Sequence, residues 1–235
     1  MGQKINPTGF RMAVTEPWRS RWFARKGEFA DLLKQDHRIR EFVKKEYGYA
    51  GISKVEIERG GKRITVILHC ARAGLLIGRQ GVKVDQLQRA LEGIVREPVE
   101  LKIREIKRPE LEAQLVAESI GEQLIKRAAF RRTIKKAVET TMSAGAQGIK
   151  VMISGRLGGA DMARTEVQRQ GRIPLQSLRA RVSYGLHEAR TTYGIIGIKV
   201  WIYMGMISDE EKDDIGRGLI KPKRQDRRRF PAGNV

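Results

Sequence analysis

The spacing of apolar residues in the first half of the chain predicts alternating helices and strands. Apolar positions at helical spacing predict helices over 39–47 and 84–94. Alternation of apolar and polar residues predicts strands over 55–57, 64–68 and 99–103, and Gly60-Gly61 favours a hairpin between the first two strands. With a short helix before the second long one, the order is helix, strand, strand, short helix, helix, strand.

The second half predicts two helices followed by a sheet. Helical spacing is found over 111–124 and 130–142, and alternation over 149–153, 180–186 and 196–202, with a further strand around 164–172. Lys107-Arg108-Pro109 marks the boundary between the halves, because proline disfavours a helix before it and suits a first helical turn. Two helices against an antiparallel sheet make the fold class α+β.

A Gly-x-x-Gly turn, Gly78 to Gly81, stands between the short helix and the next long one. Glycine has no Cβ, so its backbone can approach a sugar-phosphate chain, and the free N–H groups at a helix start attract phosphate oxygens. Arg79 adds a positive charge and Gln80 adds a donor and an acceptor. The turn and the surrounding order of elements resemble a type II KH domain, which implies binding of single-stranded nucleic acid at these four residues.

Charge makes a polyanion the expected partner. The 235 residues include 47 Lys and Arg against 27 Asp and Glu, a net charge of +20. The sequence shows no apolar run long enough to span a membrane, no signal peptide and no myristoylation pattern, so we expect a soluble, cytosolic protein without a membrane partner. We predict a basic N-terminal arm over 1–16 that is extended rather than packed, a KH-like domain over 17–107, an α+β domain over 108–207, and a basic, disordered tail over 208–235.

Residues that carry catalysis or hold metals are not grouped in this sequence. Cys70, the only cysteine, ends a predicted strand and is interpreted as a small core residue rather than a nucleophile. The three histidines lie far apart, and neither a zinc pattern nor a nucleotide-binding loop is present. We therefore predict no catalytic residue, metal, cofactor or small-molecule substrate.

Four basic residues form one stripe on the helix predicted over 130–142. With Phe130 at 0° and about 100° per residue, Ile134 and Val138 fall at about 40° and 80°. The basic residues lie at about 100°, 140°, 200° and 240°; they are Arg131, Lys135, Arg132 and Lys136. A solvated helix face usually mixes signs to gain i,i+4 ion pairs, and like charges at that spacing are destabilising. The pattern therefore favours contact with a polyanion over a plain solvated face.

Two further basic segments each leave two interpretations open. Arg156 lies in the glycine-rich run 154–160, which is either a flexible turn or a backbone nest that places Arg156 beside a phosphate. Trp18 and Trp22 lie among arginines and could stack on bases, but we favour the interpretation that they fasten the N-terminal segment to the KH core.

Several runs of the chain resemble the family of bacterial small-subunit ribosomal protein three, and the resemblance covers nearly all of the sequence. These runs are 1–7, 77–81, 130–132, 154–160, 171–175, 192–197 and 199–201. The resemblance implies a structural component of the small-subunit head that binds small-subunit rRNA and neighbouring head proteins. It also implies that Arg131, Arg132 and Lys135 line the mRNA entry channel and help to separate paired mRNA, and Lys136 aligns with a basic residue.

Two functions of other classes compete with this hypothesis. An RNA-remodelling or nucleic-acid-cleaving enzyme requires a catalytic set, and no carboxylate pair, metal cluster or nucleotide loop stands out. A free KH-type regulator of mRNA would not require the arm, the second domain and the tail all to be basic. The sequence therefore favours a non-enzymatic protein that binds rRNA and mRNA within the ribosome.

Overall fold

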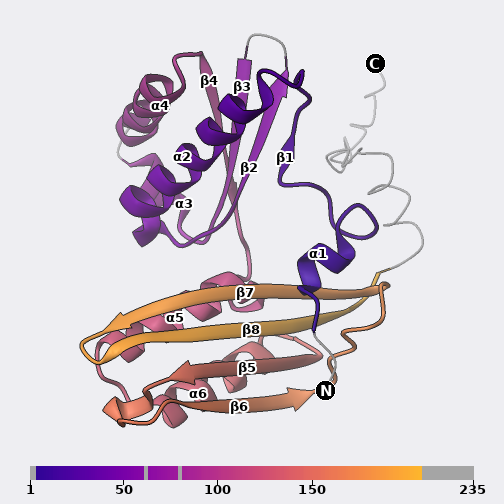
Figure 1. The fold of residues 1–235 in the computed structure, drawn as a ribbon, viewed down its shortest axis with the longest axis vertical. Helices are drawn as coiled ribbons and strands as arrows, with labels where there is room; N and C mark the ends of the chain where they lie inside the picture. Colours follow the sequence, from indigo (N-terminus) through magenta and orange to yellow (C-terminus); the bar gives the residue numbers. More distant parts are fainter. Residues whose placement is uncertain (1–3, 61–62, 79–80, 208–235) are drawn as a thin grey trace, which may run out of the picture.

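Two four-stranded sheets, each covered by helices on one face, make up the protein (Figure 1). The computed structural model describes residues 4–60, 63–78 and 81–207. The first sheet has the order β1-β2-β3-β4, with bounds Ser20–Arg21, Ile52–Gly60, Arg63–Cys70 and Val99–Glu105. The second has the order β6-β5-β8-β7, where β5 to β8 are Gly148–Gly155, Arg164–Gly171, Ala180–Thr191 and Gly194–Met206. The predicted α+β class is confirmed.

In the first unit, three helices cover one face of the mixed sheet (Figure 1). They are α2 (Phe29–Tyr47), α3 (Ala73–Ile77) and α4 (Val82–Val95), with a short 3-10 turn at Gly48–Ala50. β2 and β3 form the predicted antiparallel hairpin, and β3 pairs with β4 in parallel. Ile39, Leu68 and Leu87 are buried between the layers, and Cys70 is buried with them, as expected of a core residue. The periodicity therefore identified the right faces, although α2 begins ten residues before the predicted helix.

The second unit packs two helices behind a fully antiparallel sheet (Figure 1). α5 (Ala113–Ile125) and α6 (Phe130–Ser143) follow a 3-10 turn at Pro109–Leu111, and another 3-10 turn at Leu157–Gly159 joins β5 to β6. Gly185 of β7 allows α5 to approach closely, because a Cβ at this position would lie 2.3 Å from the carbonyl oxygen of Ala113. The strand predicted around 164–172 is confirmed as β6, at one edge of the sheet.

The N-terminal segment is packed, so the expectation of an extended arm over 1–16 is wrong for its described residues. Asn6 caps the short helix α1 (Pro7–Arg11), and its Oδ1 accepts a hydrogen bond from the N–H of Thr8 at 3.0 Å. The Arg11 side chain is buried and donates to main-chain carbonyl oxygens of α1, of the loop before β7 and of the first residue of β7; they belong to Pro7, Pro174, Leu175, Ser177 and Ala180. A buried guanidinium needs such acceptors, and they lie in a segment too distant in sequence for local pattern to reveal.

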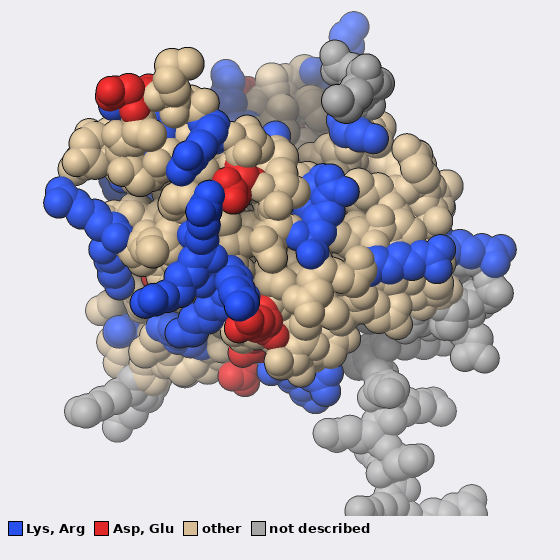
Figure 2. Space-filling model, turned by 90° about the horizontal axis from the view of Figure 1, so that it is seen from below, with Lys and Arg blue, Asp and Glu red and all other residues tan. Residues whose placement is uncertain are grey.

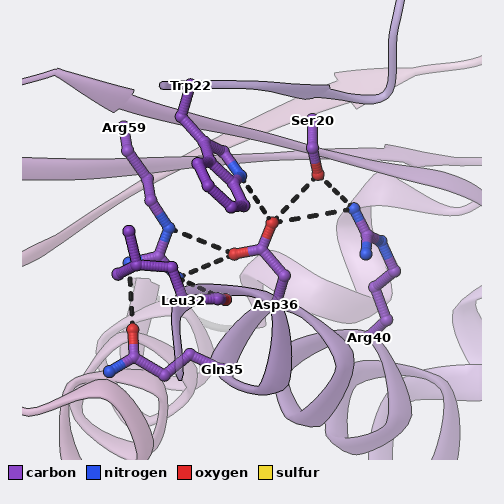
Figure 3. A network of polar contacts seen from close by, with 7 residues as sticks. All are labelled: Ser20, Trp22, Leu32, Gln35, Asp36, Arg40 and Arg59. Atoms are coloured by element: carbon purple, nitrogen blue, oxygen red, sulfur yellow. Dashed lines mark hydrogen bonds and ion pairs between the residues drawn. The ribbon is translucent and has the colours of Figure 1, made fainter. Parts of the chain in front are cut away.

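A buried carboxylate fastens β1 to the first unit (Figure 3). Asp36 on α2 accepts two bonds from Arg59 at 2.7 and 3.1 Å, and one from Trp22 Nε1 at 2.9 Å. Ser20 Oγ of β1 donates to the same carboxylate at 3.0 Å, and Arg40 lies 4.0 Å away. The expected fastening role is confirmed for Trp22, whereas Trp18 is 59% exposed. β1 was not predicted, since two residues show no periodicity.

Glu56 of β2 lies on the other face of the first sheet, where it lines a cleft of about 910 Å³ between the two units. Nitrogen atoms of three side chains surround its carboxylate: Lys54 Nζ at 3.1 Å, His69 Nε2 at 3.2 Å and Arg21 Nη2 at 3.2 Å. Burial alone would raise the pKa of Glu56, but contacts with His69 and Lys54 outweigh it and lower that pKa to about 2. The charged form of this carboxylate is therefore the one that the fold stabilises.

Replacement of Asp36 by alanine should destabilise the protein strongly, because it leaves the largely buried Arg59 without its anion. Removing one partner of a buried pair costs about 3–5 kcal/mol in the free energy of unfolding. Urea denaturation of the full chain measures the change, with Asp31→Ala as the control, since the Asp31 side chain on the same helix is 78% exposed. Equal small losses in both variants would contradict a structural role for the Asp36 network.

The low pKa of Glu56 predicts a specific acid sensitivity. A carboxylate whose folded-state pKa is depressed stabilises the fold above its unfolded-state pKa, and this contribution is lost as the pH falls toward about 2. We expect the free energy of unfolding to fall between about pH 4.5 and pH 2, and to fall less in Glu56→Gln. Denaturation curves at several pH values measure how the free energy of unfolding depends on pH in each protein. The same dependence in both proteins would refute the stabilising role of the Glu56 carboxylate.

Candidate nucleic-acid interface

α6 separates an apolar face from a basic face, as the spacing predicted. Ile134 and Val138 are each only 2% exposed and pack in the second core, whereas the basic residues of the stripe point outward. The side chain of Arg131 is 74% exposed and that of Lys135 is 73% exposed. Packing of the apolar face therefore fixes the orientation of α6 about its axis, so that the basic stripe faces solvent.

Acidic neighbours neutralise this stripe only in part. Arg131 Nε lies 3.6 Å from Glu166 of β6, and Lys135 Nζ lies 3.9 Å from Glu139, one helical turn on. Arg132 and Lys136 have no acidic partner within 4.0 Å among residues 4–60, 63–78 and 81–207. Exposed pairs at these distances contribute at most about 1 kcal/mol each, so phosphate can replace them at little cost.

The position of the stripe strengthens its positive potential. Arg131 and Arg132 lie in the first turn of α6, which contains no acidic residue. The helix dipole places partial positive charge at the same end, so the two arginines are unfavourably placed for helix stability. An arrangement that costs stability without a gain in packing is typical of a surface that meets an anion.

Arg164 extends the basic surface from α6 onto the edge strand β6. Its guanidinium lies 5.5 Å from the centre of the Phe130 ring, and that of Arg131 lies 5.7 Å from the same ring. Figure 2, which views the molecule from below with respect to Figure 1, shows Lys and Arg gathered over one part of this face. Sequence analysis missed Arg164 as a site residue, since its proximity to α6 depends on the pairing of β6 with β5.

The Gly-x-x-Gly turn joins α3 to α4, as the sequence predicted. Gly78 follows α3 with φ of 69°, and Gly81 precedes α4 with φ of 81°, so both glycines occupy backbone conformations that other residues rarely adopt. A Cβ on Gly81 would meet no atom within 4 Å, which leaves the backbone at the start of α4 open to a ligand. Arg79 and Gln80 lie outside the described residues.

Arg156 is engaged within its own loop. Its guanidinium donates to the carbonyl oxygens of Ala160 and Tyr193 at 2.9 and 3.3 Å and to Asp161 Oδ1 at 3.2 Å. A Cβ on Gly159 would lie 3.1 Å from the Tyr193 ring, so the glycine-rich run packs against the β7–β8 turn. These contacts give Arg156 a local structural role, and its binding to RNA stays a prediction.

The predicted site residues thus fall into separate regions. Figure 1 places α3 and α4, which flank the turn, in the first unit and α6 in the second. The described residues include no group of three or more metal-ligating side chains, and none of their helices is long and apolar enough to cross a membrane. Burial raises the pKa of the Cys70 thiol, which keeps it in its unreactive neutral form.

Comparison with known proteins agrees with both units. One family model, described as KH domain, matches residues 38–111, and another, described as Ribosomal protein S3, C-terminal domain, matches residues 120–202. Small ribosomal subunit protein uS3 of Desulfatibacillum aliphaticivorans is 50% identical over 213 residues, which are 90% of this chain and 97% of the relative.

Other relatives cover the chain still further. The uS3 protein of Rhodopirellula baltica is 50% identical over 97% of this chain and 100% of its own length. That of Finegoldia magna is 49% identical over 100% of this chain and 96% of its own length. Identity near one half along nearly the whole sequence shows that the chain belongs to the uS3 family of small ribosomal subunit proteins.

Proposed function

We propose that this protein binds small-subunit rRNA in the head of the small ribosomal subunit and lines the mRNA entry channel with α6. As a member of the uS3 family it is a structural, non-enzymatic component of the small subunit, located with the ribosome in the cytoplasm. Neighbouring proteins of the head are its further partners in this proposal. Relatives that match nearly end to end disfavour a free KH regulator of mRNA.

The basic face of α6 is the observation that carries the proposal. Its cations are exposed on a helix whose opposite face is held in the core, and two of them lack an acidic partner among the described residues. A row of cations attracts the phosphate backbone of single-stranded and of paired RNA, and it does not distinguish one base from another. This independence of sequence suits a channel that must admit every message.

Assistance with unwinding follows from charge alone. Base pairs at the foot of a hairpin open and close thermally, and a strand held through its phosphates closes less readily. Arg131, Arg132 and Lys135 can hold the entering strand in this way, and Arg164 continues the same surface on β6. The mechanism needs no nucleotide hydrolysis by this protein, because thermal motion opens each base pair. Movement of the ribosome along the message then prevents the opened strands from pairing again.

The α3–α4 turn supplies a second, independent contact in this proposal. Gly81 leaves open backbone at the start of α4, where N–H groups and the positive end of the helix dipole attract phosphate, while the space beside Gly78 is taken by the Lys83 side chain. The predicted charge of Arg79 and the amide of Gln80 lie between these glycines in sequence. We propose that this turn clamps rRNA rather than mRNA, since its flanking helices belong to the first unit and α6 belongs to the second (Figure 1).

Loss of the α6 charges should slow ribosomes on structured messages more than on linear ones. In the triple variant Arg131→Ala, Arg132→Ala, Lys135→Ala the helix should persist, because alanine is the best helix former and like-charge repulsion is removed. Each lost phosphate contact removes about 1 kcal/mol of attraction. Single-ribosome translation through a hairpin message and a linear message should show several-fold greater slowing on the hairpin.

A matched control is the triple variant Arg38→Ala, Lys44→Ala, Lys45→Ala, which removes three exposed cations from α2 instead. Subunits with this variant should translate both messages at the same relative rates as wild type. Equal slowing of the α6 variant on both messages would indicate an assembly defect, and no slowing on either would show that the stripe is a solvated face.

Acidic residues within the α3–α4 turn should weaken binding of rRNA. Because Gly78 and Gly81 need positive φ, replacing them would strain the backbone, so the charges belong at the two positions between them. Arg79→Asp with Gln80→Asp should weaken binding of the full chain to rRNA fragments by about three- to tenfold at low salt. The control is Arg89→Asp with Gln86→Asp, the same residue types exposed on α4. Equal affinities of both variants in filter binding would argue against a clamp.

A further inference from the structure

Phe23 exposes its aromatic ring to solvent on an otherwise well-anchored segment. The residue is 92% exposed and lies two residues after β1, the strand at one edge of the first sheet (Figure 1). A phenylalanine ring in water forgoes the favourable free energy of burial, and nothing in the local fold requires an aromatic residue at a position that packs against so little. The ring is therefore available to a partner.

The chain on both sides of Phe23 is held in place. The neighbouring Trp22 donates to Asp36 at 2.9 Å, and its ring lies 5.3 Å from Phe29 and 5.9 Å from the Arg59 guanidinium (Figure 3). On the other side, the carbonyl oxygen of Arg25 accepts bonds from the N–H groups of Glu28 and Phe29. A partner that packs on the Phe23 ring therefore finds it already positioned and pays little ordering entropy.

The residues close to Phe23 in sequence are cationic. Arg19, Arg25 and Lys26 are exposed, and none of them has an acidic partner within 4.0 Å among the described residues. Arg21, by contrast, is neutralised by Glu56 and Glu58. An exposed aromatic ring on a segment rich in unpaired cations matches an unpaired nucleotide, whose base has a flat π-face and whose phosphates are anionic. An apolar protein pocket would match the ring but would have to desolvate the cations.

We infer that Phe23 is a stacking site for an unpaired base of RNA, with Arg19, Arg25 and Lys26 as contacts to the adjoining phosphates. The inference rests on the proposed RNA-binding function and adds a third contact, separate from α6 and from the α3–α4 turn. It explains why the half-buried Trp22 is bonded into the Asp36 network while its neighbour in sequence is exposed: the first aromatic residue fixes the segment and the second meets the base.

Two substitutions of Phe23 in the full chain distinguish the contribution of an aromatic ring from that of an apolar side chain of similar size. Phe23→Leu keeps an apolar side chain but removes the ring, whereas Phe23→Tyr keeps the ring. Binding of a short oligouridine, measured by fluorescence anisotropy, should weaken about three- to tenfold in Phe23→Leu and stay near wild type in Phe23→Tyr. The slope of log affinity against log salt should be the same in all three proteins, since their charge is equal.

Photocrosslinking localises the contact on the same probe. Oligouridine that carries 5-iodouridine should crosslink to residue 23 in wild type and in Phe23→Tyr, and this crosslink should be absent in Phe23→Leu. Wild-type affinity in Phe23→Leu, or crosslinks that map only elsewhere, would overturn the inference. Steeply salt-dependent binding by wild type would in that case leave the proposed RNA-binding function standing, whereas failure of wild type to bind the probe would count against both.

Discussion

Repulsion among an excess of positive charges is the constraint on which the rest of this structure depends. With 47 basic and 27 acidic residues, the chain cannot pair every cation internally. Two buried carboxylates, Asp36 and Glu56, lie beside basic side chains that are themselves partly buried, where unpaired charge would destabilise the fold most. Asp36 accepts hydrogen bonds from Arg59 and from the side chains that hold β1. Glu56 contacts Arg21, Lys54 and His69 in the cleft between the two units. These acids stabilise the interior, and most other cations are left at the surface, where water and salt screen them.

Because acidic partners are concentrated in the interior, the fold can be stable although its surface cations have few partners within the protein. The apolar face of α6 secures the helix through Ile134 and Val138, so its basic face does not have to contribute to folding. Arg132 in the first turn even opposes the helix dipole. The same principle holds at β1, where Trp22 is used for anchoring and Phe23 remains exposed. Phosphate can then supply the missing counter-charge without any change in the fold.

Long-range polar anchoring is what sequence reasoning could not foresee. Arg11 bonds with the carbonyl oxygen of Ala180, 169 residues away, and nothing near Arg11 marks it as buried. The residues around it look like a basic, glycine-containing arm, which is why packing was not expected. Arg156 is a related case, because the sequence left its role open between a turn and a phosphate contact, and the structure adds its bonds to the carbonyl oxygens of Ala160 and Tyr193. In both cases a cation's role depends on which carbonyl groups the fold brings to it.

The sequence by itself determined the order of the longer helices and strands after β1, their buried faces, the one-sided charge of α6 and the glycine turn between α3 and α4. These properties are local, since a helix or strand shows its period within a few residues and a glycine with positive φ acts at its own position. Only the tertiary structure decided that α1 is packed, that Arg164 joins the basic surface and that Phe23 is exposed beside a half-buried, hydrogen-bonded Trp22. Those outcomes depend on contacts between residues far apart in the chain, which hydrophobic periodicity does not encode.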